Sequence, residues 1–538
     1  MTSTPTTTSV GIIGAGPGGL AAAVLLAASG LRVTLYEAGP AVGGRCGAVQ
    51  AGGYRFDKGP TFFMMPYVLD EVFRAAGRRL EDYAELTRLD PMYRLIVGKA
   101  GGADVLDATQ DLGEMARRIA RLDPRDGASF QAFIEHNRAK LRHSEPILRH
   151  PMTGPLSLFG PGTWRDTLKV APLLRPHQTV YQLLSKYFRH PAVRLAMGFQ
   201  SKYLGMSPYE CPSLFTILPF IEYEYGVWHP TGGCSALSRA MAELAGELGV
   251  EVRTDTPVRE ILFSGNSARG PRATGLRTDA GEERHDHLVI NADATWALKH
   301  LIPPGIRARA GREYDAARID AMRYSCSTYM LYLGVRGGVN LPHHTIYVSA
   351  SYEDNLADIT ERGVLSEDPS AYVCNPSVTD PTLAPPGCSS LYVLLPTPNC
   401  KAAIDWPARR AEMRERALSQ LEGRFGLSEI RSRIEREEEI TPDDWRGQNI
   451  NFGATFNLAH NLGQMLHNRP QNRLRGFENL YLVGGGTHPG SGLPTIFLSA
   501  QISSRLICDQ AGVMFAGVRP VSIDALSRSA PAAVIGGR

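Results

Sequence analysis

The sequence has few of the features that mark metalloproteins, disulfide-linked proteins or membrane-spanning proteins. None of its eight cysteines forms a C-x-x-C pair or stands at zinc-ligand spacing from a histidine, so we expect reduced thiols and no metal. No stretch reaches roughly 18 uninterrupted apolar residues, so we expect no membrane span. A second nucleotide-binding motif is also missing, which argues against a disulfide reductase and against NAD docking.

The charge balance and the start of the chain exclude two further classes. The formal net charge of +3 is too small to indicate a nucleic-acid partner. Residues 1–8 are nearly all Ser, Thr and Pro and lack the basic start and apolar core of a signal peptide, so we expect a flexible lead-in and a cytoplasmic protein. Residues 515–538 are expected to form a second flexible tail. At 538 residues, with 43% hydrophobic and 21% charged residues, the chain predicts a folded protein of two or three domains.

The sequence is organised around a glycine-rich turn between an apolar strand at 10–13 and a run of helix formers at 20–28. Gly14 can adopt the unusual dihedrals of the turn, Gly16 lets the backbone approach a pyrophosphate, and Gly19 lets the helix pack close to the strand. Phosphates would bind the free N–H groups at the positive end of the helix. The predicted binding residues in this turn are Gly14, Ala15, Gly16, Gly18 and Gly19.

A second predicted strand, at 32–36, ends in Glu37 and Ala38, about 20 residues beyond the glycines. An acid at this position can accept both hydroxyls of an adenosine ribose and would repel a phosphate there. The pattern therefore predicts a Rossmann-like domain that binds FAD or NAD and not NADP.

Two further segments favour FAD. They are Gly43-Gly44-Arg45 and the stretch at 53–61, which ends in Gly59, Pro60 and Thr61. Here the sequence resembles the flavin-containing amine oxidase superfamily and, within it, the bacterial-type phytoene desaturases. The resemblance implies that Gly44 and Arg45 follow the phosphates of FAD and that 59–61 passes near the flavin. A guanidinium also suits a diphosphate by its own chemistry.

The resemblance continues along the chain, over roughly 10–509. It implies that Val258 lies along the adenine through its backbone and that Asn291, at the polar end of a strand at 288–290, faces the nucleotide. His229 stands where the family has an aromatic residue, so we assign it no role. The stretch at 479–495 precedes a predicted helix at 496–510. The resemblance implies that Gly485 and Gly486 meet the ribityl and phosphate part, and that the flavin ring faces Leu493, Pro494 and Thr495.

These motifs predict an α/β protein with a discontinuous Rossmann-like FAD-binding domain made of 9–100, 225–300 and 471–514. Residues 301–470, with part of 101–224, are expected to form a mixed-sheet substrate-binding domain. Residues 110–224 are predicted to form a helical lid, in which prolines between 151 and 172 prevent one long helix. Apolar and basic side chains are interleaved at 152–199. This pattern fits a lid with a buried face or a monotopic membrane contact, and the same segment can be both.

The activity implied by the resemblance is desaturation of phytoene or a related C30 or C40 polyene. A hydride leaves an allylic carbon for non-covalently bound FAD, a proton leaves the adjacent carbon, and oxygen or a membrane quinone reoxidises the flavin. The protein would therefore be peripherally associated with the membrane.

Two other functions stay open on the same fold. A carotenoid isomerase would use reduced flavin without net oxidation, and a non-enzymatic prenyl-binding protein would use no flavin. The intact flavin motifs argue against the latter, and the segments at 57–61 and 487–490 argue against an amine oxidase. The sequence does not identify the catalytic acid or base, for which His488 and Glu222 are weak candidates.

Overall fold

The computed structural model describes residues 8–267 and 270–517, so most of the two predicted tails, 1–7 and 518–538, lies outside the described residues. The first described residues of the C-terminal tail pack against the fold. The backbone N–H of Ala516 donates to the Ser29 hydroxyl at 3.0 Å, and the Arg505 guanidinium lies over the Phe515 ring. The prediction of a flexible tail from 515 is therefore wrong for these residues.

The predicted Rossmann-like domain contains a five-stranded parallel sheet in the order β19-β13-β1-β2-β9. Its strands are β1 (Ser9–Ile13), β2 (Arg32–Tyr36), β9 (Glu251–Arg253), β13 (His287–Ile290) and β19 (Leu480–Leu482). Both faces of a parallel sheet are usually covered, so its inner strands are buried and mostly apolar. β1 follows this pattern and is buried along its whole length. The sheet brings together three distant parts of the sequence, as predicted.

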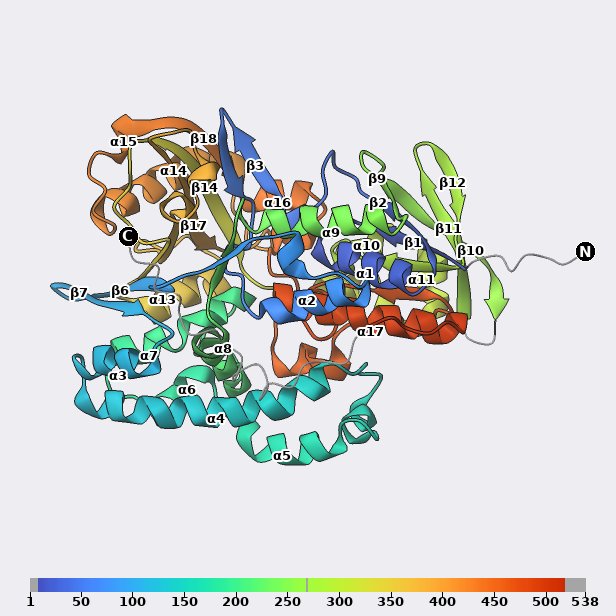
Figure 1. Ribbon diagram of the computed structural model, residues 1–538, viewed down its shortest axis with the longest axis horizontal. Coiled ribbons are helices and arrows are strands. Elements are labelled where there is room, and N and C mark those ends of the chain that lie inside the picture. Colours follow the sequence, from blue (N-terminus) through green and yellow to red (C-terminus); the bar gives the residue numbers. More distant parts are fainter. Residues whose placement is uncertain (1–7, 268–269, 518–538) are drawn as a thin grey trace, which may run out of the picture.

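Helices and a small antiparallel sheet complete this domain (Figure 1). The helices are α1 (Pro17–Ala28), α2 (Pro66–Ala75), α9 (Ser235–Glu247), α10 (Ala294–His300), α11 (Pro304–Ala310), α12 (Ala316–Ala321) and α17 (Leu493–Ala511). The antiparallel sheet contains β10 (Val258–Ser267), β11 (Gly270–Thr278) and β12 (Gly281–Arg284).

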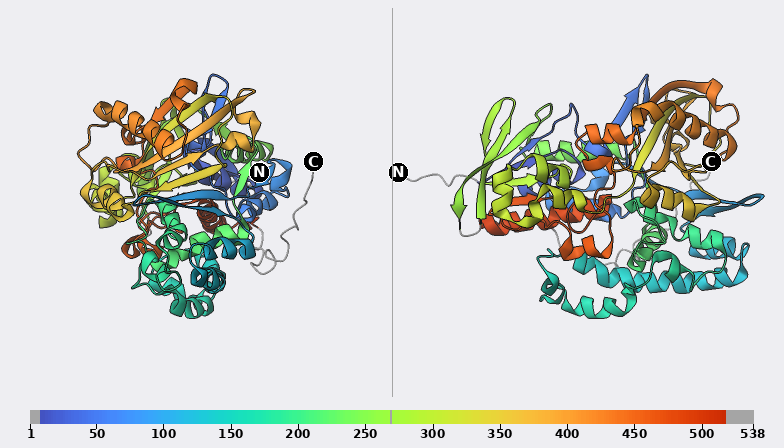
Figure 2. Two further views of the ribbon diagram at one scale, coloured as in Figure 1. Left: turned by 90° about the vertical axis from the view of Figure 1, so that its left-hand side faces the viewer. Right: turned by 180° about the vertical axis from the view of Figure 1, so that it is seen from behind.

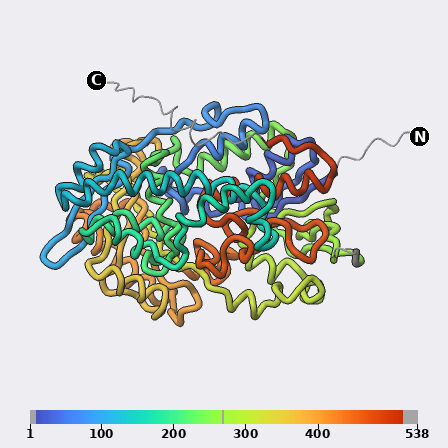
Figure 3. Tube along the Cα trace, turned by 90° about the horizontal axis from the view of Figure 1, so that it is seen from below, coloured from blue at the N-terminus to red at the C-terminus, as the bar shows by residue number. Residues whose placement is uncertain are grey.

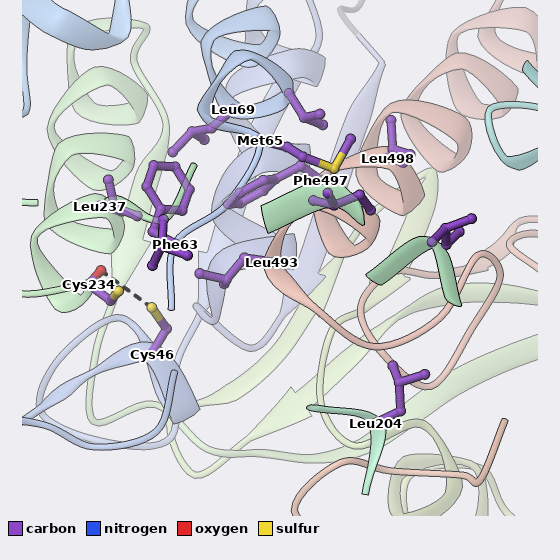
Figure 4. Close-up of a cluster of buried hydrophobic side chains, with 14 of the residues drawn as sticks. Cys46, Phe63, Met65, Leu69, Leu204, Cys234, Leu237, Leu493, Phe497 and Leu498 are labelled. Carbon is purple, nitrogen blue, oxygen red and sulfur yellow. Dashed lines mark hydrogen bonds between the residues drawn. The ribbon is translucent and has the colours of Figure 1, made fainter. Parts of the chain in front are cut away.

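A shared apolar core joins the helices that pack around α1. Figure 4 shows Phe63 and Leu69, from the N-terminal part, beside Leu237 of α9 and Phe497 of α17. Full burial of an aliphatic or aromatic side chain contributes about 1.5–3 kcal/mol. Because these side chains come from segments far apart in sequence, their burial holds the discontinuous domain together.

The second domain is a seven-stranded mixed sheet in the order β18-β14-β17-β16-β15-β6-β7. Its strands are β6 (Tyr93–Lys99), β7 (Gly102–Ala108), β14 (Ser327–Arg336), β15 (His344–Val348), β16 (Ala371–Cys374), β17 (Cys388–Thr397) and β18 (Ile434–Ile440). We predicted 93–100 in the FAD-binding domain, but β6 pairs in parallel with β15 of this sheet. The long separation in sequence between β6 and β15 hides that pairing from local patterns.

A layer of helices lies on one side of both domains and matches the predicted lid (Figures 1 and 3). The helices are α3 (Leu112–Ala120), α4 (Pro124–Leu148), α5 (Trp164–Leu174), α6 (Val180–Leu184), α7 (Pro191–Ala196) and α8 (Ile217–Tyr225). As predicted, the segment does not form one helix, although Pro172 lies inside α5 instead of ending it.

Figure 2 shows the two domains and the lid from two further sides. The chain also forms shorter elements. They include β3 (Ala48–Ala51), β4 (Tyr54–Asp57), β5 (Leu86–Arg88), β8 (Trp228–Pro230), α13 (Tyr352–Ala357), α15 (Ile430–Arg433) and α16 (Pro442–Gly447), while α14 (Trp406–Gly423) packs on the mixed sheet. Among the described helices, none is both long enough and apolar enough to cross a bilayer.

Candidate flavin and substrate site

A cavity of about 1100 Å³ lies where the two sheets meet the lid. Most of the predicted cofactor residues form part of its wall. They are Gly14, Gly16, Gly18, Glu37, Ala38, Gly44, Arg45, Gly59, Pro60, Thr61, Val258, Asn291, Gly485, Gly486, Leu493 and Pro494. The other three, Ala15, Gly19 and Thr495, are not part of this wall and instead hold wall residues in place.

The glycine turn has the geometry that its sequence predicts. Gly14 has a φ of +99°, and its N–H donates to the carbonyl of Tyr36 at 2.7 Å. A Cβ on Gly19 would lie 2.2 Å from the Gly14 carbonyl oxygen, so only glycine permits this close packing. No side chain caps α1, whose first turn therefore offers its N–H groups to a ligand in the cavity.

Two backbone hydrogen bonds fix the carboxylate of Glu37 at the cavity wall. Its Oε2 accepts from the N–H of Ala15 at 2.8 Å, and its Oε1 accepts from the N–H of Gly39 at 2.9 Å. These contacts orient the acid beside the glycine turn, where the ribose of a dinucleotide would bind. The ribose contact of Glu37 stays a prediction.

Arg45 connects the N-terminal motif to a loop that is distant in sequence. Its Nη1 donates to the carbonyl of Thr455 at 2.7 Å, and its Nη2 donates to Oδ1 of Asn457 at 3.2 Å. Burial lowers the pKa of Arg45, while nearby Asp293 acts in the opposite direction. A Cβ on Gly59 would lie 2.5 Å from the Arg45 carbonyl oxygen, so a glycine is needed for 59–61 to pass behind the arginine.

The C-terminal wall is held by a buried arginine that the sequence analysis missed. The guanidinium of Arg469 is 1% exposed and donates to the carbonyls of Gly485 at 2.6 Å and Thr487 at 3.2 Å. Its remaining hydrogen bonds, at 3.3–3.4 Å, go to the carbonyls of Leu458, Ala459 and Gln464. Burial lowers the pKa of Arg469 to about 9, so the group is still charged at neutral pH. No local pattern distinguishes this arginine from a surface residue.

The rest of the wall is largely aromatic and apolar. The ring of Phe62 stacks on His344, with the ring centroids 4.1 Å apart, and lies 5.2 Å from the ring of Tyr203. The hydroxyl of Tyr372 lies 2.7 Å from Oγ1 of Thr61 and 2.7 Å from Nδ1 of His344. The apolar side chains of this part include Met64, Met330, Ile346, Val348 and Leu394. Such a space suits a long hydrocarbon better than a polar amine.

Comparisons with known proteins identify the family. A model of the flavin containing amine oxidoreductase family matches residues 17–508. The chain is 40% identical to a 4,4'-diapophytoene desaturase (4,4'-diapolycopene-forming) of Methylomonas sp, over 94% of this chain and 96% of that protein. It is also 40% identical to an all-trans-zeta-carotene desaturase of Myxococcus xanthus, over 93% of each chain. The chain belongs to the carotenoid desaturases of this flavoprotein family.

The fold of this desaturase is shared with a distant oxidase. Cyclohexylamine oxidase from Brevibacterium oxydans has a TM-score of 0.57 and 16% identity, covering 94% of this chain and 100% of that chain. The comparisons confirm the predicted family, the predicted fold and the prediction of a flavin-dependent oxidoreductase.

Neither weak catalytic candidate of this desaturase lies on the described cavity wall. The ring of His488 is buried, and burial lowers its pKa to about 4. Glu222 is fully buried one layer behind the wall, in contact with Tyr203. His229, to which we assigned no role, is buried with its Nε2 3.2 Å from Oδ2 of Asp380.

Proposed function

We propose that this protein is an FAD-dependent desaturase that introduces conjugated double bonds into phytoene or a related C30 or C40 polyene. The observation that carries the proposal is one continuous cavity, in which a dinucleotide cradle at Gly14, Gly16 and Glu37 opens into an aromatic and apolar chamber. The names of the relatives point to the same substrate class.

When bound, FAD would supply the hydride acceptor, and the chain would supply binding and alignment. The first turn of α1 would bind the diphosphate, Glu37 the adenosine ribose, and the start of α17 would face the flavin ring. The N–H groups there would stabilise negative charge on the ring. The apolar chamber would exclude water and hold the polyene extended beside the ring.

We propose that FAD binds non-covalently. Two cysteines line the described cavity wall, Cys46 and Cys326, and burial raises the pKa of both thiols, to about 12 for Cys46. Cys46 also donates through its sulfur to the carbonyl of Cys234 at 3.4 Å. Because the thiolate is the reactive form, neither group is suited to attack the flavin.

We also propose that the lid contacts the membrane from the cytoplasmic side, so that the polyene enters from lipid. Four exposed hydrophobic side chains lie on or next to α5, with exposed fractions of 83% for Leu156, 59% for Phe159, 42% for Trp164 and 59% for Leu168. Arg165 and Lys169 lie among them and would meet anionic headgroups. Oxygen or a membrane quinone would reoxidise the flavin.

The test uses purified protein reconstituted with FAD and given phytoene or diapophytoene in liposomes without oxygen. Bleaching of the flavin absorbance together with new polyene absorbance is expected. Conversion that needs prior chemical reduction of the flavin, and leaves the number of double bonds unchanged, would instead establish a carotenoid isomerase. Protein that purifies without flavin and does not take up FAD would favour the prenyl-binding alternative.

A further inference from the structure

Desaturation releases a proton as well as a hydride, and the proton needs an acceptor. Two carboxylates line the described cavity wall, Glu37 and Asp293. Glu37 is held at the glycine turn, and Asp293 caps α10 by accepting from the N–H of Trp296 at 3.0 Å and the hydroxyl of Thr295 at 2.8 Å. Both belong to the nucleotide part of the cavity, so the chamber for the polyene has no carboxylate of its own among the described residues.

A carboxylate nevertheless lies directly behind the wall of that chamber. Glu222, on α8, is fully buried, and its Oε1 accepts from the hydroxyl of Tyr203 at 2.8 Å. Its Oε2 accepts from the hydroxyl of Tyr93 and from Nε2 of Gln200, each at 3.0 Å. No ion pair to Glu222 is found among the described residues. The carboxylate therefore has hydrogen bonds but no counterion.

The surroundings of Glu222 raise its pKa toward neutral pH. Its titratable neighbours are tyrosines, namely Tyr93 of β6, Tyr203 of the turn Phe199–Leu204, and Tyr223 of α8 itself. Burial raises the pKa of Glu222 to about 7, with the three hydrogen bonds opposing this rise. A group with such a pKa can take up a proton and release it again at neutral pH.

Tyr203 is the link between this carboxylate and the chamber. It lines the cavity beside Phe62, whereas Tyr93 and Gln200 are absent from the described wall. We propose that Glu222 accepts, through the hydroxyl of Tyr203, the proton that leaves the polyene during desaturation. This inference rests on the proposed function.

The carbon–hydrogen bond next to the site of hydride loss breaks, and its electron pair becomes part of the new double bond. The proton binds the Tyr203 oxygen while the proton of the Tyr203 hydroxyl moves to Oε1 of Glu222, so Tyr203 ends unchanged and Glu222 ends neutral. When bound, FAD would accept the hydride from the neighbouring carbon. Burial keeps the pKa of Tyr203 well above 10, so the tyrosine needs the carboxylate behind it.

A second tyrosine on the wall offers a competing route. The hydroxyl of Tyr372 lies 2.7 Å from Nδ1 of His344. Burial lowers the pKa of His344 well below 6.5, with the nearby His229 acting in the same direction. A proton would not stay on that imidazole at neutral pH, which favours Glu222.

The test compares Tyr203→Phe with Tyr93→Phe in the FAD-loaded protein. Each variant removes one hydroxyl from Glu222 and keeps the ring, but only Tyr203 reaches the chamber. Flavin reduction by phytoene in a single anaerobic turnover is measured against pH. In the wild type the rate should rise with pH around 7. The rate of flavin reduction should fall at least about 100-fold in Tyr203→Phe. In Tyr93→Phe it should stay within a few-fold of the wild-type rate and keep the same pH dependence.

A second readout does not depend on turnover. Infrared spectra of the substrate-free protein should contain a protonated-carboxyl band that disappears as pH rises through about 7. The band should be missing in Glu222→Gln and retained in Tyr203→Phe, and the visible flavin spectrum shows whether each variant is folded.

Several results would overturn the inference. They are equal losses in the two tyrosine variants, loss in Tyr372→Phe in place of Tyr203→Phe, or no carboxyl band that titrates near neutral pH. A wild-type protein whose flavin is not reduced by phytoene or diapophytoene would overturn the proposed function together with the inference. Normal wild-type reduction with an unaffected Tyr203→Phe would overturn the inference alone.

Discussion

Replacing Arg469 tests how the C-terminal part of the cofactor wall is held. Arg469→Met keeps a long apolar side chain but removes every hydrogen bond to the five carbonyls around the guanidinium. Arg469→Lys keeps the charge but not the planar fork of donors. Arg473→Met is the matched control, because Arg473 lies on the same segment, is partly exposed and donates to the single carbonyl of Glu478 at 2.8 Å.

The expected loss of stability follows from these contacts. A buried carbonyl that loses its partner costs about 1–3 kcal/mol, and the bonds to Gly485 and Thr487 alone give a loss of about 4 kcal/mol for Arg469→Met. Lysine can still reach one carbonyl, so the stability loss in Arg469→Lys should be about half that in Arg469→Met. The control should lose about 1 kcal/mol or less.

The assay is urea unfolding followed by circular dichroism, with FAD affinity measured in parallel by flavin fluorescence. Because Gly485 and Gly486 line the cavity, Arg469→Met should weaken FAD binding as well as lower the unfolding midpoint. An Arg469→Met protein with the stability and FAD affinity of the Arg473→Met control would refute the reasoning. In that case the five hydrogen bonds of Arg469 would contribute no more to stability and FAD affinity than the single hydrogen bond of Arg473 does.

Three other changes give expected outcomes of their own. Glu37→Ala should purify with less FAD, because the ribose loses its charged acceptor, and a fully yellow variant would contradict this assignment. The triple variant Leu156→Ser, Phe159→Ser and Leu168→Ser should sediment several-fold less with anionic vesicles and keep its unfolding midpoint. Unchanged sedimentation would indicate that the segment is a lid without a membrane contact. The folded pKa of Glu222 is raised from 4.5 to about 7, so its contribution to stability is complete below pH 4.5 and is lost as pH rises through 7. Relative to Glu222→Gln, the wild type should therefore lose about 3 kcal/mol between pH 4.5 and 8 in urea titrations; parallel curves would contradict the raised pKa.

The nucleotide half of the site could be predicted from the sequence because its determinants are local. Gly14, Gly16 and Gly19 act within one turn between a strand and a helix, and Glu37 follows the next strand. Short spacing along the chain thus translates directly into short distances in space.

The polyene half could not be predicted in the same way. Glu222 meets Tyr93 across 129 residues of sequence, and the pairing of β6 with β15 joins segments that are still farther apart in the chain. Hydrophobic periodicity does not specify which strand pairs with which. Arg469 was missed for a related reason, since its partners are backbone carbonyls, which leave no mark in the sequence.

The discontinuous parallel sheet has a consequence for how the protein is made. β1 leaves the ribosome first, but β19 and α17 are among the last described elements to be synthesised. At about 5–20 residues per second, roughly 25 to 100 seconds pass before the strand at Leu480–Leu482 exists. Until then the nascent chain exposes apolar faces that only its final segments cover. The complete cofactor wall, which includes Gly485 and Gly486, therefore forms only after the C-terminal segment has been translated.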